Sequence, residues 1–377
     1  MNIRIFNPEH DIALASNMER FTAPHAGRQL RSGLCYLPAL WADEGDVVIV
    51  DDIDFAESAY RKLKAERKPQ VEFCTMEQIA HVLSSSHVTP VIDPWGWDPA
   101  LRFQLLSAAV SENSLPSKEA VQELRRLSGR QCTTSVLENV RRGIESKTCG
   151  KSTYLTDYDS FCNLLQNNRG MVVKAPWSSS GRGLRYFLEG EKNANALNWV
   201  KNVIHLQGGV MVEPLYNKVK DFGMEFRRDA EGRVHYLGLS LFQTVNGAYT
   251  GNILATEAVK RDMMSRYVDF ALLDEITTRL ETELTVLFST LPPEPSLSDL
   301  RFGVDMMIVA KNATSSFSLE NAECDGFLLH PCVEINLRRT MGHVALALSP
   351  LDDIKQGTMA INYDSKRYHL KIKYNYM

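Results

Sequence analysis

The sequence lacks long apolar runs and any excess of positive charge. No stretch approaches the ~18 apolar residues that a membrane-spanning helix requires, and Glu9, His10 and Asp11 interrupt the apolar stretch near the N-terminus. We therefore expect no signal peptide, no membrane partner and a cytoplasmic location. The net charge of −4 gives no basic surface for nucleic acid, so no nucleic-acid partner is expected either.

Paired cysteines and the common nucleotide-binding motifs are absent too. The seven cysteines are scattered and never occur as C-x-x-C, which predicts reduced, buried thiols rather than disulfides or a zinc site. The chain has no G-x-x-x-x-G-K motif and no G-x-G-x-x-G at the start of a helix, so it contains neither a P-loop nor a dinucleotide-binding fingerprint.

What the sequence does contain is the pattern of an α/β protein. Short apolar runs at 3–6 and 46–50 are typical of buried parallel strands, with helical patterns between them. From 171 to 258 the pattern changes to hairpins, followed by a predicted helix over about 263–291 and two strands at 301–310 and 330–338. We predict a Rossmann-like N-terminal part, followed by a largely antiparallel part.

The segment VVKAPWSSSGRGLRYF places Lys174 at the end of an apolar strand, before a long loop of small residues. Backbone N–H groups of serine and glycine approach phosphate oxygens closely because no large side chain intervenes, and a lysine beside them adds a positive charge. A flexible, solvent-exposed hairpin is the alternative interpretation of this loop.

A second constellation lies near the C-terminus. GVDMMIVA carries Asp305 on one strand, and CVEINLR carries Glu334, Asn336 and Arg338 at alternate positions of another. Alternate residues of a strand share a face. Two carboxylates and an amide oxygen are ligands of the kind that Mg²⁺ takes beside nucleotide phosphates, and arginine can clamp a phosphate. The alternative is a surface hairpin, but such a face would be costly to bury with nothing bound.

These segments resemble the ATP-grasp superfamily, in which a strand-borne lysine and glycine-rich loop precede a hinge glutamate and a terminal D…E-x-N-x-R. Here these are Lys174 with its loop, MVEPL at 211–215, and Asp305 with EINLR. The resemblance implies an N-terminal Rossmann-like domain (1–116), a central lid subdomain (117–215) and a C-terminal subdomain with the metal site (216–377). It also implies that two antiparallel sheets sandwich the nucleotide.

The resemblance further implies a set of ATP contacts. Glu213 would read the adenine amino group, and Asp221 would accept from the ribose hydroxyls. Glu225 competes for that last role, or forms an ion pair with Arg227 or Arg228. The full set of expected nucleotide contacts is Arg130, Lys174, Ser178, Ser179, Ser180, Gly181, Gly183, Glu213, Leu215 and Asp221.

The chemistry implied by the resemblance is in-line transfer of the γ-phosphoryl group to a carboxylate. Asp305, Glu334 and Asn336 would hold two Mg²⁺ ions, with Mn²⁺ as an alternative metal. Lys174 and Arg338 would act on the phosphates, and Arg301 would replace an arginine that many relatives carry where this chain has Gly303. The loop after Lys174 would close as a lid that excludes water.

Several segments are candidates for the acceptor site. DPWGWD at 93–98 presents Trp95 and Trp97, which we interpret mainly as packing residues, and TVNGAYTGN at 244–252 flanks the expected γ-phosphate. NPEHD follows the first strand, where ligands of open α/β sheets gather, and RRTMGH flanks the expected γ-phosphate. Arginine pairs well with a substrate carboxylate. The candidate substrate residues are Asn7, Glu9, His10, Asp11, Arg339 and His343.

Three classes of function remain open at this stage. The favoured one is a ligase that joins a small carboxylate to an amine or thiol. A small-molecule kinase on the same fold is the second, and a non-catalytic nucleotide-binding protein is the third. The retention of Asp305, Glu334, Asn336 and Arg338 argues against the third class. The oligomeric state is open, with a homodimer as one option.

Overall fold

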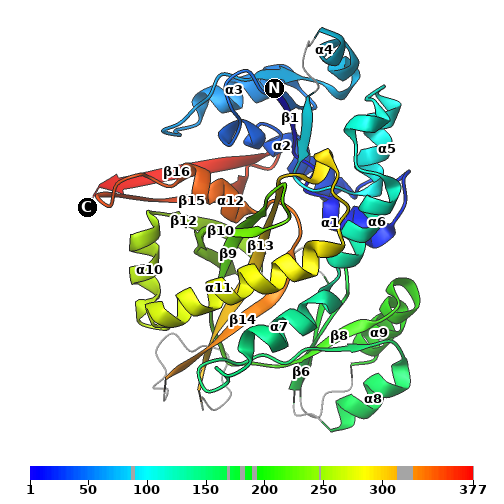
Figure 1. The fold of residues 1–377 in the computed structure, drawn as a ribbon, viewed down its shortest axis with the longest axis vertical. Coiled ribbons are helices and arrows are strands. Elements are labelled where there is room, and N and C mark those ends of the chain that lie inside the picture. The colour runs from blue at the N-terminus through cyan, green and yellow to red at the C-terminus, as the bar shows by residue number, and fades with distance from the viewer. Residues whose placement is uncertain are drawn as a thin grey trace.

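The structure, a computed structural model, describes residues 1–85, 90–167, 170–178, 183–188, 193–245, 248–311 and 326–376. The N-terminal part, drawn in blue at the top of Figure 1, is built on a parallel sheet. The order of its strands is β3-β2-β1-β4. Its strands are β1 (Asn2–Ile5), β2 (Val47–Ile49), β3 (Glu72–Cys74) and β4 (Val91–Pro94). The predicted strands at 3–6 and 46–50 are β1 and β2.

Five helices accompany this sheet in the described part of the chain: α1 (His10–Ser16), α2 (His25–Leu34), α3 (Ile53–Lys62), α4 (Ile79–Ser85) and α5 (Pro99–Ser107). Strand β2 is apolar throughout because both faces of the sheet are buried there. On β2, Val47 and Ile49 belong to one hydrophobic cluster, while Val48 belongs to another on the opposite face.

A helical connection leads from the parallel sheet to the central part. It consists of α6 (Lys118–Leu127), the 3₁₀ turn η4 (Arg130–Cys132) and α7 (Thr133–Arg141). Ser117 caps α6 by accepting a hydrogen bond from the Ala120 amide at 3.0 Å. The connection brings Arg130 to the surface of the second sheet.

The second sheet is antiparallel, with the order β5-β8-β6-β7. Its elements are β5 (Thr153–Leu155), α8 (Tyr158–Gln166), β6 (Gly170–Lys174), β7 (Leu184–Leu188), α9 (Ala194–Gln207) and β8 (Val210–Pro214). It has a hydrophobic cluster of its own, formed with α8 and α9. This separate core suits a subdomain that moves as a unit.

The third sheet is antiparallel, with the order β10-β9-β13-β14. Its elements are β9 (Lys218–Arg228), β10 (Val234–Ser240), α10 (Glu257–Ser265), α11 (Phe270–Leu287), β13 (Leu300–Ala310) and β14 (Phe327–Asn336). The single helix predicted over about 263–291 is wrong: Asp269 starts a new helix by accepting from the Leu272 amide at 2.7 Å, so two helices form.

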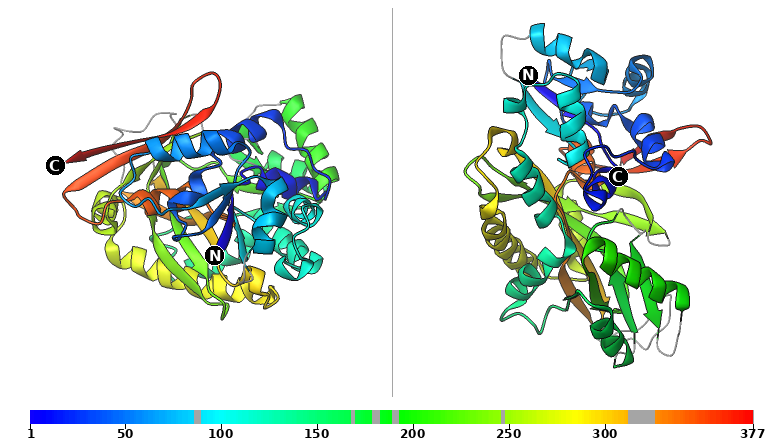
Figure 2. Two further views of the ribbon diagram at one scale, coloured as in Figure 1. Left: turned by 90° about the horizontal axis from the view of Figure 1, so that it is seen from above. Right: turned by 90° about the vertical axis from the view of Figure 1, so that its right-hand side faces the viewer.

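The fourth sheet, β11-β12-β15-β16, lies against the N-terminal part although it is largely built from the C-terminus (Figure 2). Its elements are β11 (Phe242–Val245), β12 (Ala248–Leu254), α12 (Met341–Leu348), β15 (Lys355–Tyr363) and β16 (Tyr368–Tyr376). The contact is tight, since a Cβ on Gly33 of α2 would lie 2.7 Å from the Tyr368 carbonyl oxygen.

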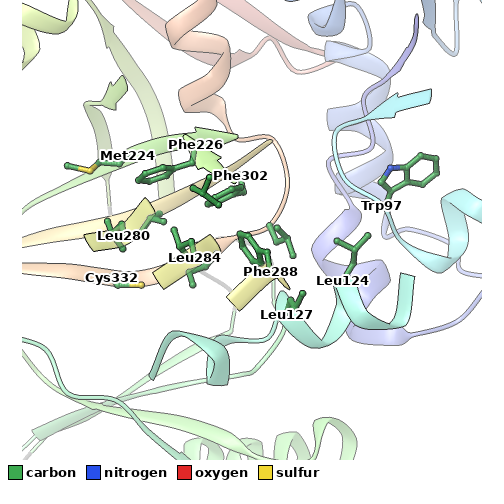
Figure 3. Close-up of a cluster of buried hydrophobic side chains, with 14 of the residues drawn as sticks. Trp97, Leu124, Leu127, Met224, Phe226, Leu280, Leu284, Phe288, Phe302 and Cys332 are labelled. Carbon is green, nitrogen blue, oxygen red and sulfur yellow. The ribbon is translucent and has the colours of Figure 1, made fainter. Parts of the chain in front are cut away.

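One hydrophobic cluster joins the parallel sheet to the third sheet (Figure 3). Phe226 and Phe302 stack with ring centroids 5.5 Å apart, and Phe288 of the segment after α11 meets Phe302 edge-on. Trp97 and Leu124 belong to the same cluster from the N-terminal side. A shared core of this kind fixes the N-terminal strand ends relative to β13 and β14.

Two absences complete the description. Among the described helices, none is long and apolar enough to cross a membrane. The six cysteines within the described ranges carry free thiols, as predicted; Cys35, Cys74, Cys149 and Cys332 are buried, whereas Cys132 and Cys162 are only partly buried. The domain boundaries at 116 and 215 stay a prediction.

Candidate active site

Arg130 joins the two motifs that the sequence placed far apart. Its Nη1 donates to the Ala175 carbonyl oxygen at 2.5 Å and to the Ser178 Oγ at 2.7 Å, at the start of the small-residue loop. Its Nη2 lies 2.7 Å from Glu334 Oε1 on β14. One buried guanidinium therefore touches both the base of the loop and the carboxylate site on the third sheet.

Lys174 forms an ion pair across the second sheet. Its Nζ lies 2.7 Å from Glu213 Oε2, and both side chains are buried, at 7% and 8% exposed. The pair forms because β6 and β8 are adjacent, with Val172 opposite Glu213 and Lys174 opposite Met211. The two residues predicted to contact opposite ends of the nucleotide are thus ion-pair partners in this structure.

The predicted carboxylates face each other across β13 and β14. Asp305 is paired in register with Glu334, and Gly303 with Asn336, as expected for neighbouring antiparallel strands. The Asn336 side-chain amide donates to Asp305 Oδ2 at 3.1 Å. The structure therefore assembles the predicted metal set on one face of the third sheet.

Asp305 lacks enough positive charge nearby to stay ionised easily. Burial raises its pKa to about 7, and the negative charges of Glu334 and Glu225 add to the shift. Asn336 and Arg338 oppose it only in part. A bound cation would relieve this repulsion.

The donor set fits a hard divalent cation such as Mg²⁺, because it consists of two carboxylates and an amide oxygen. Within the described ranges, no group of three or more histidine, cysteine, aspartate or glutamate side chains is arranged to hold a metal, so this set would need phosphate or water oxygens as well. That requirement matches a site for a metal–nucleotide complex more closely than a closed structural metal site.

Arg338 is fixed between the metal set and the N-terminal part. Its guanidinium donates to both carboxylate oxygens of Asp11, at 2.9 and 2.7 Å, and to Asn336 Oδ1 at 3.1 Å. The Asp11 partnership lowers the pKa of that carboxyl against the opposing effect of burial. Asp11, a candidate substrate residue, is thus placed as the anchor of a predicted phosphate-binding arginine.

Three predicted residues are not brought into contact with this centre. Arg301 points to Asp299, with Nη2 2.8 Å from its carboxylate. Asp221 on β9 pairs with Lys218 at 2.6 Å, and Leu215 is 38% exposed after β8. Their predicted roles toward ATP stay predictions.

Glu225 does not pair with Arg227 or Arg228, so the ion-pair alternative for it is wrong. Its Oε2 accepts from the Thr340 hydroxyl at 2.8 Å and lies 2.9 Å from His343 Nδ1. The carboxylate reaches them because Gly342 has no side chain; a Cβ there would collide with it. His343, a candidate substrate residue, is thereby used within a buried network beside Asp305.

In the segment after β1, some side chains contact neighbouring protein groups and others line a cavity. Asn7 is used structurally, donating to the Gly96 carbonyl oxygen and to Asp98. His10 is 2% exposed, with Nδ1 3.5 Å from Asp98. Glu9 pairs with Arg31 at 2.6 Å, yet its second oxygen, Oε2, is buried without a partner. Burial raises the pKa of Glu9 despite Arg31.

Glu9 lines a cavity of about 840 Å³ at the carboxyl ends of the parallel strands. Its other walls include Arg28, Arg31, Met76 and Leu101. Such a position and size are typical of small-molecule sites in open α/β sheets. The sequence missed Arg31 because it lies in a separate helix, α2, with no motif around it.

Arg339 does not face that cavity. Its Nη2 donates to Asp93 Oδ2 at 2.7 Å, and its guanidinium lies 5.0 Å from the centre of the Trp41 ring. Trp95 and Trp97 are buried, as their interpretation as packing residues requires. No local pattern in the sequence indicates Asp93 as the partner of Arg339, since 246 positions separate the two residues.

The loop itself is described only at its ends, because Ser179, Ser180 and Gly181 lie outside the described residues. At its far end Gly183 is packed against Ser178, and a Cβ on Gly183 would collide with that side chain. The Gly183 carbonyl oxygen accepts from the Ala175 amide at 2.9 Å, which closes the loop.

Gly183→Val should therefore displace Ser178 from Arg130 and weaken ATP binding by roughly tenfold, as expected for one hydrogen bond to a charged group. Gly27→Ala is the control, because the nearest atom to a Cβ at Gly27 would be 3.6 Å away. Gly143→Ala is unsuitable, because Gly143 has a positive φ of 83°. ATP affinity is measured by calorimetry, with melting temperatures to verify folding. Unchanged affinity in Gly183→Val would show that the loop ends do not shape the nucleotide site.

No protein-family model matches this chain, and no curated protein matches it either. Among solved structures, it is similar to N5-carboxyaminoimidazole synthetase from Staphylococcus aureus complexed with ADP, at 12% identity, covering 96% of this chain and 82% of that one, with a TM-score of 0.48. It is also similar to a biotin carboxylase–β-γ-ATP complex from Campylobacter jejuni, at 11% identity, 96% and 75% coverage and a TM-score of 0.49. The likeness is one of overall arrangement only.

A parallel α/β sheet at the N-terminus is followed by antiparallel sheets. The fold class predicted from the sequence is confirmed in this respect.

Proposed function

We propose that the protein is an ATP-dependent ligase that joins a small carboxylate to an amine or thiol and releases ADP and phosphate. The observation that carries the proposal is the position of Arg130, which contacts the loop after Lys174 and Glu334 at once. Lys174 directly precedes Ala175, and Arg338 contacts Asn336, two residues along β14 from Glu334. A phosphate chain bound between the contacts of Arg130 would therefore meet three cationic side chains.

Phosphoryl transfer requires mainly positioning and charge neutralisation from the protein. Arg130, Lys174 and Arg338 would bind the phosphate oxygens, and Asp305, Glu334 and Asn336 would hold Mg²⁺. The metal, when bound, supplies charge neutralisation at the β- and γ-phosphates. Glu213, released from Lys174, would accept a hydrogen bond from the adenine amino group.

The reaction would proceed in two balanced steps. A carboxylate oxygen attacks the γ-phosphorus, the bond from that phosphorus to the bridging oxygen breaks, and ADP leaves. The nitrogen or sulfur nucleophile then attacks the acyl carbon, and inorganic phosphate leaves with the electron pair of the carbon–oxygen bond. Exclusion of water protects the acylphosphate between these steps.

The cavity lined by Glu9 is the best-supported place for the acceptor. Glu9 and Asp11 stand two residues apart, and Asp11 bonds Arg338, which bonds Asn336 of the metal set. A substrate beside Glu9 is therefore separated from the phosphate-binding residues by only this short chain of contacts. The buried, unpartnered oxygen of Glu9 suits a hydrogen-bond donor on that substrate.

The reaction is tested by incubating the protein with Mg-ATP and pooled small carboxylates, with and without pooled amines and amino acids. We expect little ADP from ATP alone, and ADP with phosphate only when a carboxylate and a nucleophile are both present. Hydroxylamine should replace the nucleophile by trapping the acylphosphate.

Formation of AMP and pyrophosphate would contradict attack at the γ-phosphorus. ADP formed from a sugar or polyol, with no carboxylate present, would identify a kinase instead. The Asp305→Asn variant provides the background rate in every arm of the experiment.

A further inference from the structure

A second cavity, of about 530 Å³, lies beside β4 at the edge of the parallel sheet. Its walls come from β1, β4, the 3₁₀ turn η6 (Pro295–Leu297), the start of β13 and the segment 337–339. It shares no lining residue with the cavity beside Glu9. Its volume lies within the usual range for small-molecule sites, which is roughly 300–1,000 Å³.

Three buried donor groups on its lining residues have no hydrogen-bond partner. They are the Trp41 indole Nε1–H, the Ser296 hydroxyl and the Arg339 Nε–H. Unsatisfied buried donors are rare in folded proteins and call for a ligand or water. Among the described lining residues, no carboxylate or amide oxygen is left in the same condition. The cavity therefore lacks hydrogen-bond acceptors for these three donors.

The arginines that line the cavity are paired with carboxylates but keep N–H donors to spare. Arg339 is 4% exposed and shares the carboxylate of Asp93 with Arg4. Arg4 also pairs with Asp46 at 2.8 Å, and Arg301 pairs with Asp299. The arginine charges are matched by carboxylates, but each guanidinium offers five N–H donors and these pairs use only some of them.

The pKa of Arg339 reflects this crowding of positive charge. Burial lowers the pKa, the Asp93 carboxylate opposes that effect, and the nearby cations Arg301 and Arg4 lower it further. An additional negative charge beside Arg339 would offset both the burial and the repulsion.

We propose that this cavity binds an oxyanion, a carboxylate or a phosphate ester, on a small apolar body that packs against Trp41. The oxyanion would accept from Arg339 Nε, Trp41 Nε1 and Ser296 Oγ after small side-chain shifts. Leu40, Leu337 and Ala347 provide the apolar wall.

The site is connected to the predicted phosphate-binding residues by one peptide unit. Arg338 Nη1 donates to the Arg339 carbonyl oxygen at 3.1 Å, and the Arg339 amide donates to the Trp95 carbonyl oxygen at 2.7 Å. An anion that moves the Arg339 side chain would also shift the backbone that carries Arg338. This coupling rests on the proposed function, whereas the binding itself does not.

Binding is tested without nucleotide, with orthophosphate and benzoate as probes and sodium chloride at matched ionic strength as the reference. We expect both probes to raise the melting temperature, because ligands that bind only the folded state stabilise it. Trp41→Phe and Ser296→Ala each remove one donor and keep most of the side-chain volume. Calorimetry should show affinities about tenfold weaker for each variant.

Ser298→Ala is the matched control. Ser298 lines the same cavity, but its hydroxyl already donates to the Pro295 carbonyl oxygen at 2.7 Å, so its removal should leave the affinity unchanged. The double variant Lys174→Met/Glu213→Gln removes a buried ion pair of the nucleotide phosphate site without leaving one charge unpaired, and anion binding should persist in it.

Two results would overturn the proposal. One is equal affinity in the wild type, Trp41→Phe and Ser296→Ala, with all three folded. The other is loss of anion binding in the folded Lys174→Met/Glu213→Gln variant, which would place the anion at the nucleotide phosphates. If anion binding follows the donors while ATP turnover is absent, this inference stands and the ligase proposal fails.

Discussion

Asp305→Asn is expected to abolish Mg-dependent ADP formation without unfolding the protein. The Asp305 carboxylate is buried close to other negative charges. Burial, Glu334 and Glu225 together raise its pKa to about 7. Metal binding during transfer is worth several kcal/mol, so the rate should fall by roughly 10³-fold or more. ADP release at saturating Mg-ATP and co-substrates measures this.

The same substitution should not lower the free energy of unfolding, because the pKa of Asp305 is raised in the folded protein. The folded-state pKa lies above the ordinary value of 3.8, so the folded protein binds more protons than the unfolded chain between that value and about pH 7. Ionisation of Asp305 therefore lowers the free energy of unfolding as pH rises through this window. Asp305→Asn removes that loss, so its melting temperature at pH 8 should equal or exceed that of the wild type.

Glu334→Gln and Asp274→Asn complete the test. Glu334→Gln should show a comparable loss of turnover, because Glu334 faces Asp305 in register. Asp274 lies on α11, far from the predicted set in sequence, and its side chain is 65% exposed, so Asp274→Asn should retain activity. Near-wild-type rates in both Asp305→Asn and Glu334→Gln, with unchanged melting, would remove the metal assignment.

Local patterns in the sequence were sufficient for most of the strands that hold this site. The apolar runs of β1 and β2 and the alternation of polar residues at 334 and 336 follow from burial and from the two-residue repeat of a strand. The sequence also placed Asp305 and Glu334 on neighbouring strands, and their pairing is what the structure shows.

Long-range partners were beyond local patterns. Asp11 and Arg338 are 327 positions apart, and no local rule connects them. One alternative for Glu225 was an ion pair with a neighbouring arginine. Instead, the space left by Gly342 allows its carboxylate to contact Thr340 and His343. The packing of β16 on α2 likewise depends on Gly33, a glycine with no turn signature around it.

Replacement of Lys174 should reduce both ATP affinity and turnover, by roughly 10²-fold or more if it contacts the transferring phosphate. The single substitution Lys174→Met is ambiguous by itself, because it also leaves Glu213 buried and unpaired. Breaking one side of a buried pair costs about 3–5 kcal/mol of stability. Loss of activity could then follow from a disturbed sheet rather than from a missing phosphate contact.

The double variant Lys174→Met/Glu213→Gln resolves this ambiguity. It removes both charges, so its melting temperature should recover most of what Lys174→Met loses. Turnover should not recover with it, because the positive charge of Lys174 is still missing beside the transferring phosphate. Glu213→Gln alone should keep the lysine and lose mainly ATP affinity, with a smaller effect on the rate at saturation. If turnover recovers together with stability in the double variant, Lys174 acts only as the partner of Glu213 and not on the nucleotide.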